Sequence, residues 1–245
     1  MCQPQVHLLG VRIDNLDRQQ VLAAIKEFVV SNRPHQIITA NAELVYRAWH
    51  DPEAARVIAE AALVTPDGAG VVWAARRLEG VTLQRVTGID LTADICEAAV
   101  REGWRLFLFG GRPGVAEEAA TRLEARYPGL AVCGTAHGYL EPAEGKKLVT
   151  RIRTASPQVL LVGLGAPKQE FWVSQYLEEL GVPVCLGVGG SLDVLAGRAQ
   201  RAPGWIQRAN LEWLYRLLRQ PSRLRRQMAL PAFAWRVWWA GRRRV

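Results

Sequence analysis

The chain has 245 residues, of which 49% are hydrophobic and 22% are charged, and its formal net charge is +8. The apolar fraction excludes a chain that is disordered as a whole, and the length suffices for a buried core. The longest apolar runs have about ten residues, too few for a membrane-spanning helix, and four scattered cysteines (Cys2, Cys96, Cys133 and Cys185) indicate neither a zinc site nor a disulfide framework.

The first residues contain no basic segment followed by an apolar one. No secretory signal is therefore predicted, and we expect the chain to stay in the cytoplasm. Segment 6–13, which comes next, predicts an edge strand or a hairpin.

Short apolar runs then alternate with helical patterns along most of the chain. The runs predict strands at 35–40, 62–65, 105–109, 131–135, 158–163 and 183–188. The other stretches predict helices at about 17–31, 42–50, 52–61, 68–79, 88–102, 113–127, 142–155 and 167–180. Strands that are apolar on both faces and alternate with helices are typical of a mostly parallel sheet covered by helices, so the sequence predicts the α/β class.

Charge is distributed unevenly. Residues 198–245 contain 12 Arg, no Lys and one acidic residue, Glu212, which gives a net charge of +11 and leaves −3 for residues 1–197. Five of the nine tryptophans also lie in 198–245. The shift predicts a catalytic α/β domain over 1–197 and a helical appendage over 198–245, with helices at about 204–219 and 222–240. Arg with Trp suits an anionic, partly apolar surface, either a lipid headgroup layer or a nucleic acid.

Glycine-rich turns follow three of the predicted strands, and a fourth strand is followed by a Gly-Tyr pair. The residues are Gly110 and Gly111, Gly163 and Gly165, Gly189 and Gly190, and Gly138 and Tyr139. Glycine lets a ligand approach the backbone closely, and the free N–H groups at a helix start attract phosphate. One such turn occurs in any α/β protein, but three at the same sheet edge indicate a site for a nucleoside diphosphate.

Several familiar motifs are absent from the sequence. It contains no GxGxxG, no GxxxxGK[ST] and no GxSxG, which argues against a dinucleotide enzyme, a P-loop ATPase and an α/β-hydrolase. No Asp-x-Asp pair follows a strand, which argues against the usual metal clamp of sugar-nucleotide enzymes.

Polar side chains follow two further strands. Asp67 lies directly before a predicted helix, where it is either an N-cap or a carboxylate general base. Thr39 and Asn41 precede another helix, which either of them could cap. Arg85 is equally suited to a surface ion pair and to a carboxylate or phosphate ligand.

Together these loops resemble the WecG/TagA/CpsF glycosyltransferases in order and spacing. The resemblance covers nearly the whole chain from about Val6 onward. It rests on Thr39-Ala-Asn41-Ala-Glu43, Thr65-Pro-Asp67-Gly68, Arg85-Val-Thr-Gly88, Phe109-Gly-Gly111, Gly138-Tyr139, Gly163-Leu-Gly165-Ala-Pro-Lys-Gln169-Glu170 and Gly187-Val-Gly-Gly190.

The resemblance implies a Rossmann-like sheet with helices on both faces and an inverting, metal-independent reaction without a cofactor. Members move N-acetylmannosamine or a related sugar from its UDP form onto undecaprenyl-diphosphate-GlcNAc, in wall teichoic acid or other surface-polysaccharide synthesis. By motif, Asp67 matches the proposed base, and Thr39, Asn41, Arg85 and Gln169 match further catalytic-site residues. The glycines named above, Tyr139 and Asp193 match the UDP-sugar site, and Asp193 is the alternative base.

The tail is expected to dock on an anionic membrane at its inner face, because Arg side chains recur there at helical spacing. Arg216, Arg223 and Arg226 are the candidates for binding the acceptor's diphosphate. A solvated Arg face on an ordinary helix is the alternative, and a homo-oligomer is left open.

A nucleic-acid-binding protein remains the second hypothesis for the whole chain, although the body is net acidic and has no RNA-binding signature. A Rossmann-type oxidoreductase is the third.

Overall fold

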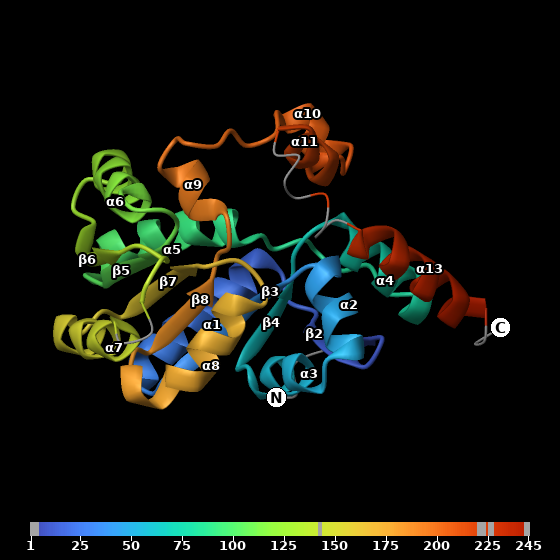
Figure 1. Cartoon of the computed structure of the whole chain (residues 1–245), viewed down its shortest axis with the longest axis horizontal. Coiled ribbons are helices and arrows are strands. Elements are labelled where there is room, and N and C mark those ends of the chain that lie inside the picture. The colour runs from blue at the N-terminus through green and yellow to red at the C-terminus, as the bar shows by residue number, and fades with distance from the viewer. Residues whose placement is uncertain (1–4, 142–143, 220–223, 225–227, 243–245) are drawn as a thin grey trace.

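The computed structural model describes residues 5–141, 144–219, 224 and 228–242. Six parallel strands form one sheet in the order β4-β3-β8-β7-β5-β6, and helices cover both of its faces (Figure 1). The predicted Rossmann-like α/β class is confirmed. These strands are β3 (His35–Ala40), β4 (Leu63–Pro66), β5 (Arg105–Gly110), β6 (Ala131–Ala136), β7 (Val159–Gly163) and β8 (Val184–Gly187).

Segment 6–13 forms the hairpin that the sequence allowed. Strands β1 (Gln5–Leu8) and β2 (Val11–Asp14) pair antiparallel in a separate two-stranded sheet. The turn residues Leu9 and Gly10 both have positive φ, as a tight two-residue hairpin turn requires. The buried carboxylate of Asp14 accepts the backbone N–H of Val64 at 2.7 Å, so the hairpin is fixed to strand β4 at the edge of the main sheet.

Neighbouring residues of each strand pack against opposite layers of helices. In β3, Ile37 belongs to the core of the first layer and Ile38 to that of the second, because successive side chains point to opposite faces. The first layer contains α1 (Arg18–Ser31), α5 (Gly88–Glu102), α6 (Val115–Arg126) and α9 (Ser191–Leu195). The second contains α2 (Ala42–His50), α3 (Pro52–Glu60), α4 (Ala69–Glu79), α7 (Glu144–Ala155), α8 (Lys168–Leu180) and α13 (Ala229–Arg242).

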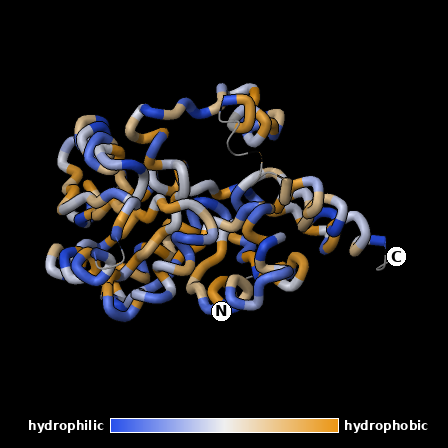
Figure 2. Tube along the Cα trace, viewed as in Figure 1, coloured by the Kyte–Doolittle hydropathy of each residue, from blue (hydrophilic) through white to orange (hydrophobic). Residues whose placement is uncertain are grey.

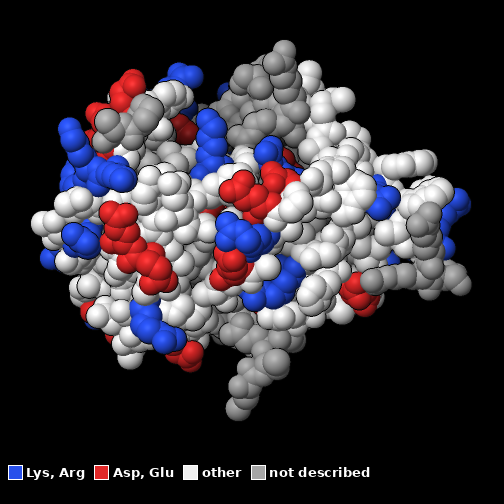
Figure 3. All heavy atoms as spheres, turned by 60° about the horizontal axis from the view of Figure 1, so that its bottom comes forward, with Lys and Arg blue, Asp and Glu red and all other residues white. Residues whose placement is uncertain are grey.

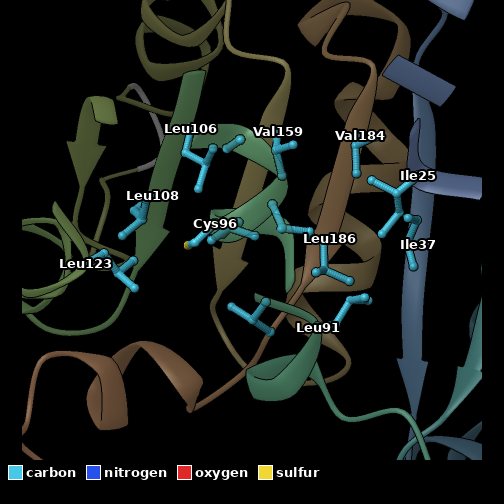
Figure 4. Packing of buried hydrophobic residues seen from close by; sticks show 14 of the residues in the cluster. Ile25, Ile37, Leu91, Cys96, Leu106, Leu108, Leu123, Val159, Val184 and Leu186 are labelled. Carbon is cyan, nitrogen blue, oxygen red and sulfur yellow. The ribbon is translucent and has the colours of Figure 1, made fainter. Parts of the chain in front are cut away.

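The core under the first layer joins four strands to two long helices. Figure 4 shows Ile25 of α1 and Leu91 and Cys96 of α5 packed over side chains of β3, β5, β7 and β8. Figure 2 shows hydrophobic stretches running through the central strands and hydrophilic residues over much of the outer helices. Burial raises the pKa of the Cys96 and Cys185 thiols to about 12, so both act as small core hydrophobes.

The predicted helix over 204–219 is divided in two, α10 (Gly204–Arg208) and α11 (Glu212–Arg219). Asn210 between them has a φ of 60°, a left-handed conformation that Asn tolerates. Its N–H donates to the carbonyl of Gln207, and the N–H of Leu211 donates to the carbonyl of Ile206. This Schellman arrangement ends α10 and turns the chain, so the Arg residues of 204–219 do not lie along one continuous helix.

The last helix, α13, shares a core with the sheet domain. It packs against α2 and α4 and buries Phe233 and Val237. A Cβ atom added at Gly70 of α4 would lie 3.0 Å from the Cβ of Ala42, so glycine allows α4 to approach α2 closely beneath α13. No helix within the described ranges has the length and apolar character needed to cross a bilayer.

Candidate functional site

The carboxyl ends of all six parallel strands lie at one edge of the main sheet. The loop after β5 leads to α6 in the first layer, whereas the loop after β7 leads to α8 in the second. Because β5 and β7 are neighbours, their loops separate and form a topological switch point, where open α/β sheets bind ligands. Strands β8 and β3 form a second switch point, since β8 leads to α9 and β3 leads to α2.

The glycines of the first switch point pack against one another. The N–H of Gly111 donates to the carbonyl of Gly163 at 3.1 Å, and the N–H of Gly138 donates to that of Gly111 at 2.8 Å. At Gly110, which has a φ of +139°, an added Cβ would lie 2.5 Å from the backbone of Gly163. Loop-to-loop packing therefore requires glycine here independently of any ligand.

Gln169 joins the loops after β7 and β8. Its side-chain oxygen accepts the backbone N–H groups of Gly165 and Gly189 at 3.1 and 3.0 Å, and its Nε2 donates to Glu170 Oε1 at 2.8 Å. Gln169 and Glu170 are almost fully buried. The structure therefore places Gln169 behind the loops, where it fixes their spacing.

Thr39 and Asn41 take structural hydrogen bonds at the end of β3. The hydroxyl of Thr39 donates to the carbonyl of Gly187 at 3.0 Å and ties β3 to β8. The side-chain oxygen of Asn41 accepts the N–H of Leu44 at 2.9 Å and caps α2. The capping alternative is thus correct for Asn41.

Asp67 lies at the end of β4, next to Thr39 and Asn41 across the sheet. Residues 39 and 65 are register partners, and the N–H of Asp67 donates to the carbonyl of Ala40 at 2.9 Å. The N-cap of α4 is Gly68, and that helix start has no side-chain cap. The capping alternative is therefore wrong for Asp67, whose side chain is half-buried at the sheet edge.

Arg85 and Asp90 flank the turn that begins α5. Arg85 Nη1 lies 3.9 Å from Glu212 Oε2, and Arg201 binds Asp90 through two hydrogen bonds of 2.6 and 2.9 Å. Partial burial works to raise the pKa of Asp90, but hydrogen bonds from Arg201 and Thr87 outweigh it and hold that pKa below its ordinary value. The stabilisation by this pair is therefore complete above the ordinary carboxyl pKa and is lost as the pH falls through the lowered one.

The remaining residues assigned to the donor site lie along the same edge. Tyr139 follows β6 and is 66% exposed. Asp193 lies in the first turn of α9, and its backbone carbonyl accepts the N–H groups of Arg198 and Ala199. Gly189 and Gly190 connect β8 to α9.

Two hollows flank this row of strand ends. One, of 310 Å³, lies between the end of β6, α6 and α7, and includes His137, the neighbour of Gly138. The other, of 660 Å³, lies along α2 toward the start of α13 and includes Glu43. Each hollow thus begins beside one of the sequence motifs.

Of the tail residues assigned to the acceptor, Arg216 lies in α11, but its side chain is outside the described part of the chain, as are Arg223 and Arg226. Sequence reasoning did not assign Arg201 and Glu212 to the site. One sequence signal pointed to Glu212, since it is the only acidic residue of a strongly basic tail. Nothing in the sequence distinguished Arg201 from the other arginines.

Comparison with known proteins gives one consistent result. The model of the glycosyl transferase WecG/TagA/CpsF family matches residues 6–245. Proteins of Staphylococcus aureus strains MW2 and NCTC 8325 / PS 47 are each 34% identical over 235 residues, which is 95% of this chain and 92% of theirs. Both are named N-acetylglucosaminyldiphosphoundecaprenol N-acetyl-beta-D-mannosaminyltransferase.

Proposed function

The chain belongs to the WecG/TagA/CpsF glycosyltransferase family, and from this premise we propose that it transfers N-acetylmannosamine, or a related N-acetylhexosamine, from its UDP form to undecaprenyl-diphosphate-GlcNAc. The product would enter wall teichoic acid or a related surface polysaccharide. One observation carries this proposal: the carboxylate of Asp67, Arg85 and the glycine turns lie along one edge of a parallel sheet.

The proposed reaction is a single displacement that inverts the anomeric carbon. The hydroxyl oxygen of the acceptor GlcNAc forms a bond to C1 of the donor sugar while the bond from C1 to the phosphate oxygen of UDP breaks. The hydroxyl proton passes to the Asp67 carboxylate, and the electron pair of the broken bond leaves with UDP. A carboxylate at this edge suits the base, because a carboxylate can accept the proton of an attacking hydroxyl and Asp67 directly follows β4 beside the end of β3.

The donor is proposed to lie across the strand ends, with UDP toward β5, β6 and β7 and its sugar toward β3 and β4. Four strand-to-strand steps separate β4 from β5, or roughly 19 Å at the usual spacing. An extended nucleotide sugar therefore reaches from the glycine turns toward Asp67. Arg85 and backbone N–H groups would stabilise the charge that develops on UDP, so no metal ion is required.

A donor panel tests this function. UDP-N-acetylmannosamine, UDP-GlcNAc, UDP-GalNAc and NAD⁺ would be incubated with the full chain and a short-chain lipid-diphosphate-GlcNAc acceptor, with and without EDTA. We expect a β-linked disaccharide product from one UDP-N-acetylhexosamine and no loss of rate with EDTA. Loss of activity with EDTA would contradict metal independence, and absence of product with every sugar donor would contradict the function.

The acceptor's lipid implies a membrane surface, and aromatic side chains on three helices support one. Trp49 of α2, Trp73 of α4 and Trp235 and Trp239 of α13 are 38 to 63% exposed. Arg236 lies 3.9 Å from the centre of the Trp49 ring, so α2 and α13 form one continuous surface. α13 contains no acidic residue, whereas acidic and basic side chains are interspersed over the body face in Figure 3. Aromatic and Arg side chains together suit the anionic headgroup layer at the inner face of the cell membrane.

We expect the double substitution Trp235→Ala and Trp239→Ala to weaken sedimentation with anionic vesicles at least ~10-fold, because each large apolar side chain contributes ~1.5–3 kcal/mol when it is fully buried. Turnover of a water-soluble, short-chain acceptor should not change. Val30→Ala with Val100→Ala, on the first layer of helices, is the control for exposed apolar residues. Equal vesicle binding by both double variants would contradict a role of α13 in docking.

A further inference from the structure

The C-terminal tail (residues 198–245) forms two ionic contacts with the turn at residues 85–90, which lies beside the strand ends of the candidate site. Arg201 holds Asp90 in a two-pronged pair, and Glu212 lies 3.9 Å from Arg85. Both tail residues lie between the end of α9 and the start of α11, 111 and 127 positions along the chain from their partners. The gripped residues lie on either side of Thr87, the N-cap of α5.

That turn is hydrogen-bonded to the end of β4 and packs closely against the residues that end β3 and follow β8. The N–H of Val86 donates to the carbonyl of Pro66 at 2.9 Å, directly before Asp67. A Cβ added at Gly88 would lie 3.3 Å from the Cα of Val188 after β8 and 3.7 Å from the methyl group of Thr39 at the end of β3. A shift of this turn would therefore strain or break its hydrogen bond to β4, change its packing against Val188 and Thr39, and move Arg85.

Three carboxylates, those of Asp90, Glu212 and Asp67, surround Arg201 closely enough to stabilise its positive charge. Its hydrogen bonds to Asp90 and the charges of Asp90, Glu212 and Asp67 raise the pKa of Arg201 in spite of partial burial. Its Nε is buried and has no hydrogen-bond partner among the described residues. Arg201 thus lies within electrostatic range of the proposed base, and the only acidic residue of the basic tail lies at Arg85.

We propose that Arg201 and Glu212 are positioning residues, which fasten the tail to the 85–90 turn and so orient Arg85 and Asp67 for transfer. This inference rests on the function proposed above. Arg85 and Asp90 lie on either side of the N-cap of α5, so the two contacts together would hold the turn between them in place.

A neighbouring ion pair provides a matched control. Arg198, three residues before Arg201, forms the same kind of two-pronged pair with Glu118 of α6, at 2.7 and 2.6 Å. That pair is more exposed, with side chains 40% and 47% accessible against 25% and 29% for Arg201 and Asp90. It also joins tail to body, but it does not contact the 85–90 turn. Arg198→Gln therefore removes a tail contact without releasing the turn.

Steady-state kinetics with the short-chain acceptor test the proposal without membrane docking. We expect Arg201→Gln and Asp90→Asn each to lower kcat at least ~10-fold and to change KM for the UDP-sugar less than ~3-fold. The double variant should be no worse than either single one, because both remove the same contact. Glu212→Gln should lower kcat less, and Arg198→Gln should keep kcat within ~2-fold of the unmodified chain. An unchanged kcat in Arg201→Gln, or an equal loss in Arg198→Gln, would overturn the proposal.

Hydrogen–deuterium exchange of the full chain without substrate provides a readout that is independent of turnover. Arg201→Gln should speed exchange in peptides covering 85–95 and 204–219, whereas Arg198→Gln should leave the 85–95 peptide unchanged. If even the unmodified chain turns over no UDP-sugar, the proposed function fails. The exchange measurement still decides whether Arg201 holds the 85–90 turn in place. Unchanged exchange over 85–95 in Arg201→Gln would overturn the proposal that Arg201 positions this turn.

Discussion

Replacement of Asp67 by Asn is expected to lower kcat at least ~10²-fold, the lower scale for loss of a general base, and to leave UDP binding nearly unchanged. Asn has the size of Asp but does not take up the acceptor's proton. The site at the sheet edge would therefore still bind the nucleotide, which is proposed to lie toward β5, β6 and β7. Isothermal titration with UDP and single-turnover kinetics with the short-chain acceptor measure the two effects separately.

The stability of Asp67→Asn and the activity of a second variant, Asp193→Asn, show whether a loss of activity in Asp67→Asn reflects loss of the base. Because Gly68 and not Asp67 is the N-cap of α4, and because Asn keeps the size and hydrogen-bonding capacity of Asp, Asp67→Asn should change the free energy of unfolding by no more than about 1 kcal/mol. Asp193→Asn is the matched variant for the alternative base at the start of α9. A fully active Asp67→Asn enzyme together with an inactive Asp193→Asn enzyme would show that Asp193, and not Asp67, is the general base.

The strands and most helices could be predicted because both faces of a parallel strand are buried. Ile37 and Ile38 each face a different layer of helices, so the run around them is apolar throughout and stands out from its polar neighbours. Strand order could not be predicted, because the pairing of β3 with β8 joins residues almost 150 positions apart. The five-residue helix α9 is too short for a periodic pattern, and the break at Asn210 depends on backbone conformation that apolar spacing does not encode.

The motifs indicated a candidate site, but the hydrogen bonds and packing of several of its residues could be seen only in the fold. Gly110 and Gly163 appeared suited to a ligand, yet they also approach each other too closely for any side chain. Asn41 and Asp67 looked alike as potential helix caps, and only Asn41 is one. The contact of Arg201 with Asp90 crosses 111 positions, and local sequence patterns contain no information about contacts at that range.

The second large effect is expected at Gln169. Gln169→Leu removes the oxygen that accepts two backbone N–H groups, from Gly165 and Gly189, and the amide that donates to Glu170. A buried polar group left without a partner costs ~1–3 kcal/mol, so the free energy of unfolding should fall by about 2–5 kcal/mol. The loops after β7 and β8 would also lose their common anchor. Because a displacement of ~1 Å can cost ~10²-fold in rate, we expect kcat to fall about that much.

Gln36→Leu is the matched control, because Gln36 is equally buried and its amide donates to the backbone carbonyl of Glu170 at 2.9 Å. It loses one hydrogen bond on β3 and touches neither glycine loop, so kcat should stay within ~3-fold while stability falls by about 1 kcal/mol. Urea unfolding and steady-state kinetics of both variants separate loss of stability from loss of loop spacing. If Gln169→Leu is destabilised as expected but retains the kcat of Gln36→Leu, the spacing of these two loops does not control the reaction. If kcat falls only in Gln169→Leu, the fixed distance between the β7 and β8 loops is what the buried glutamine contributes to transfer.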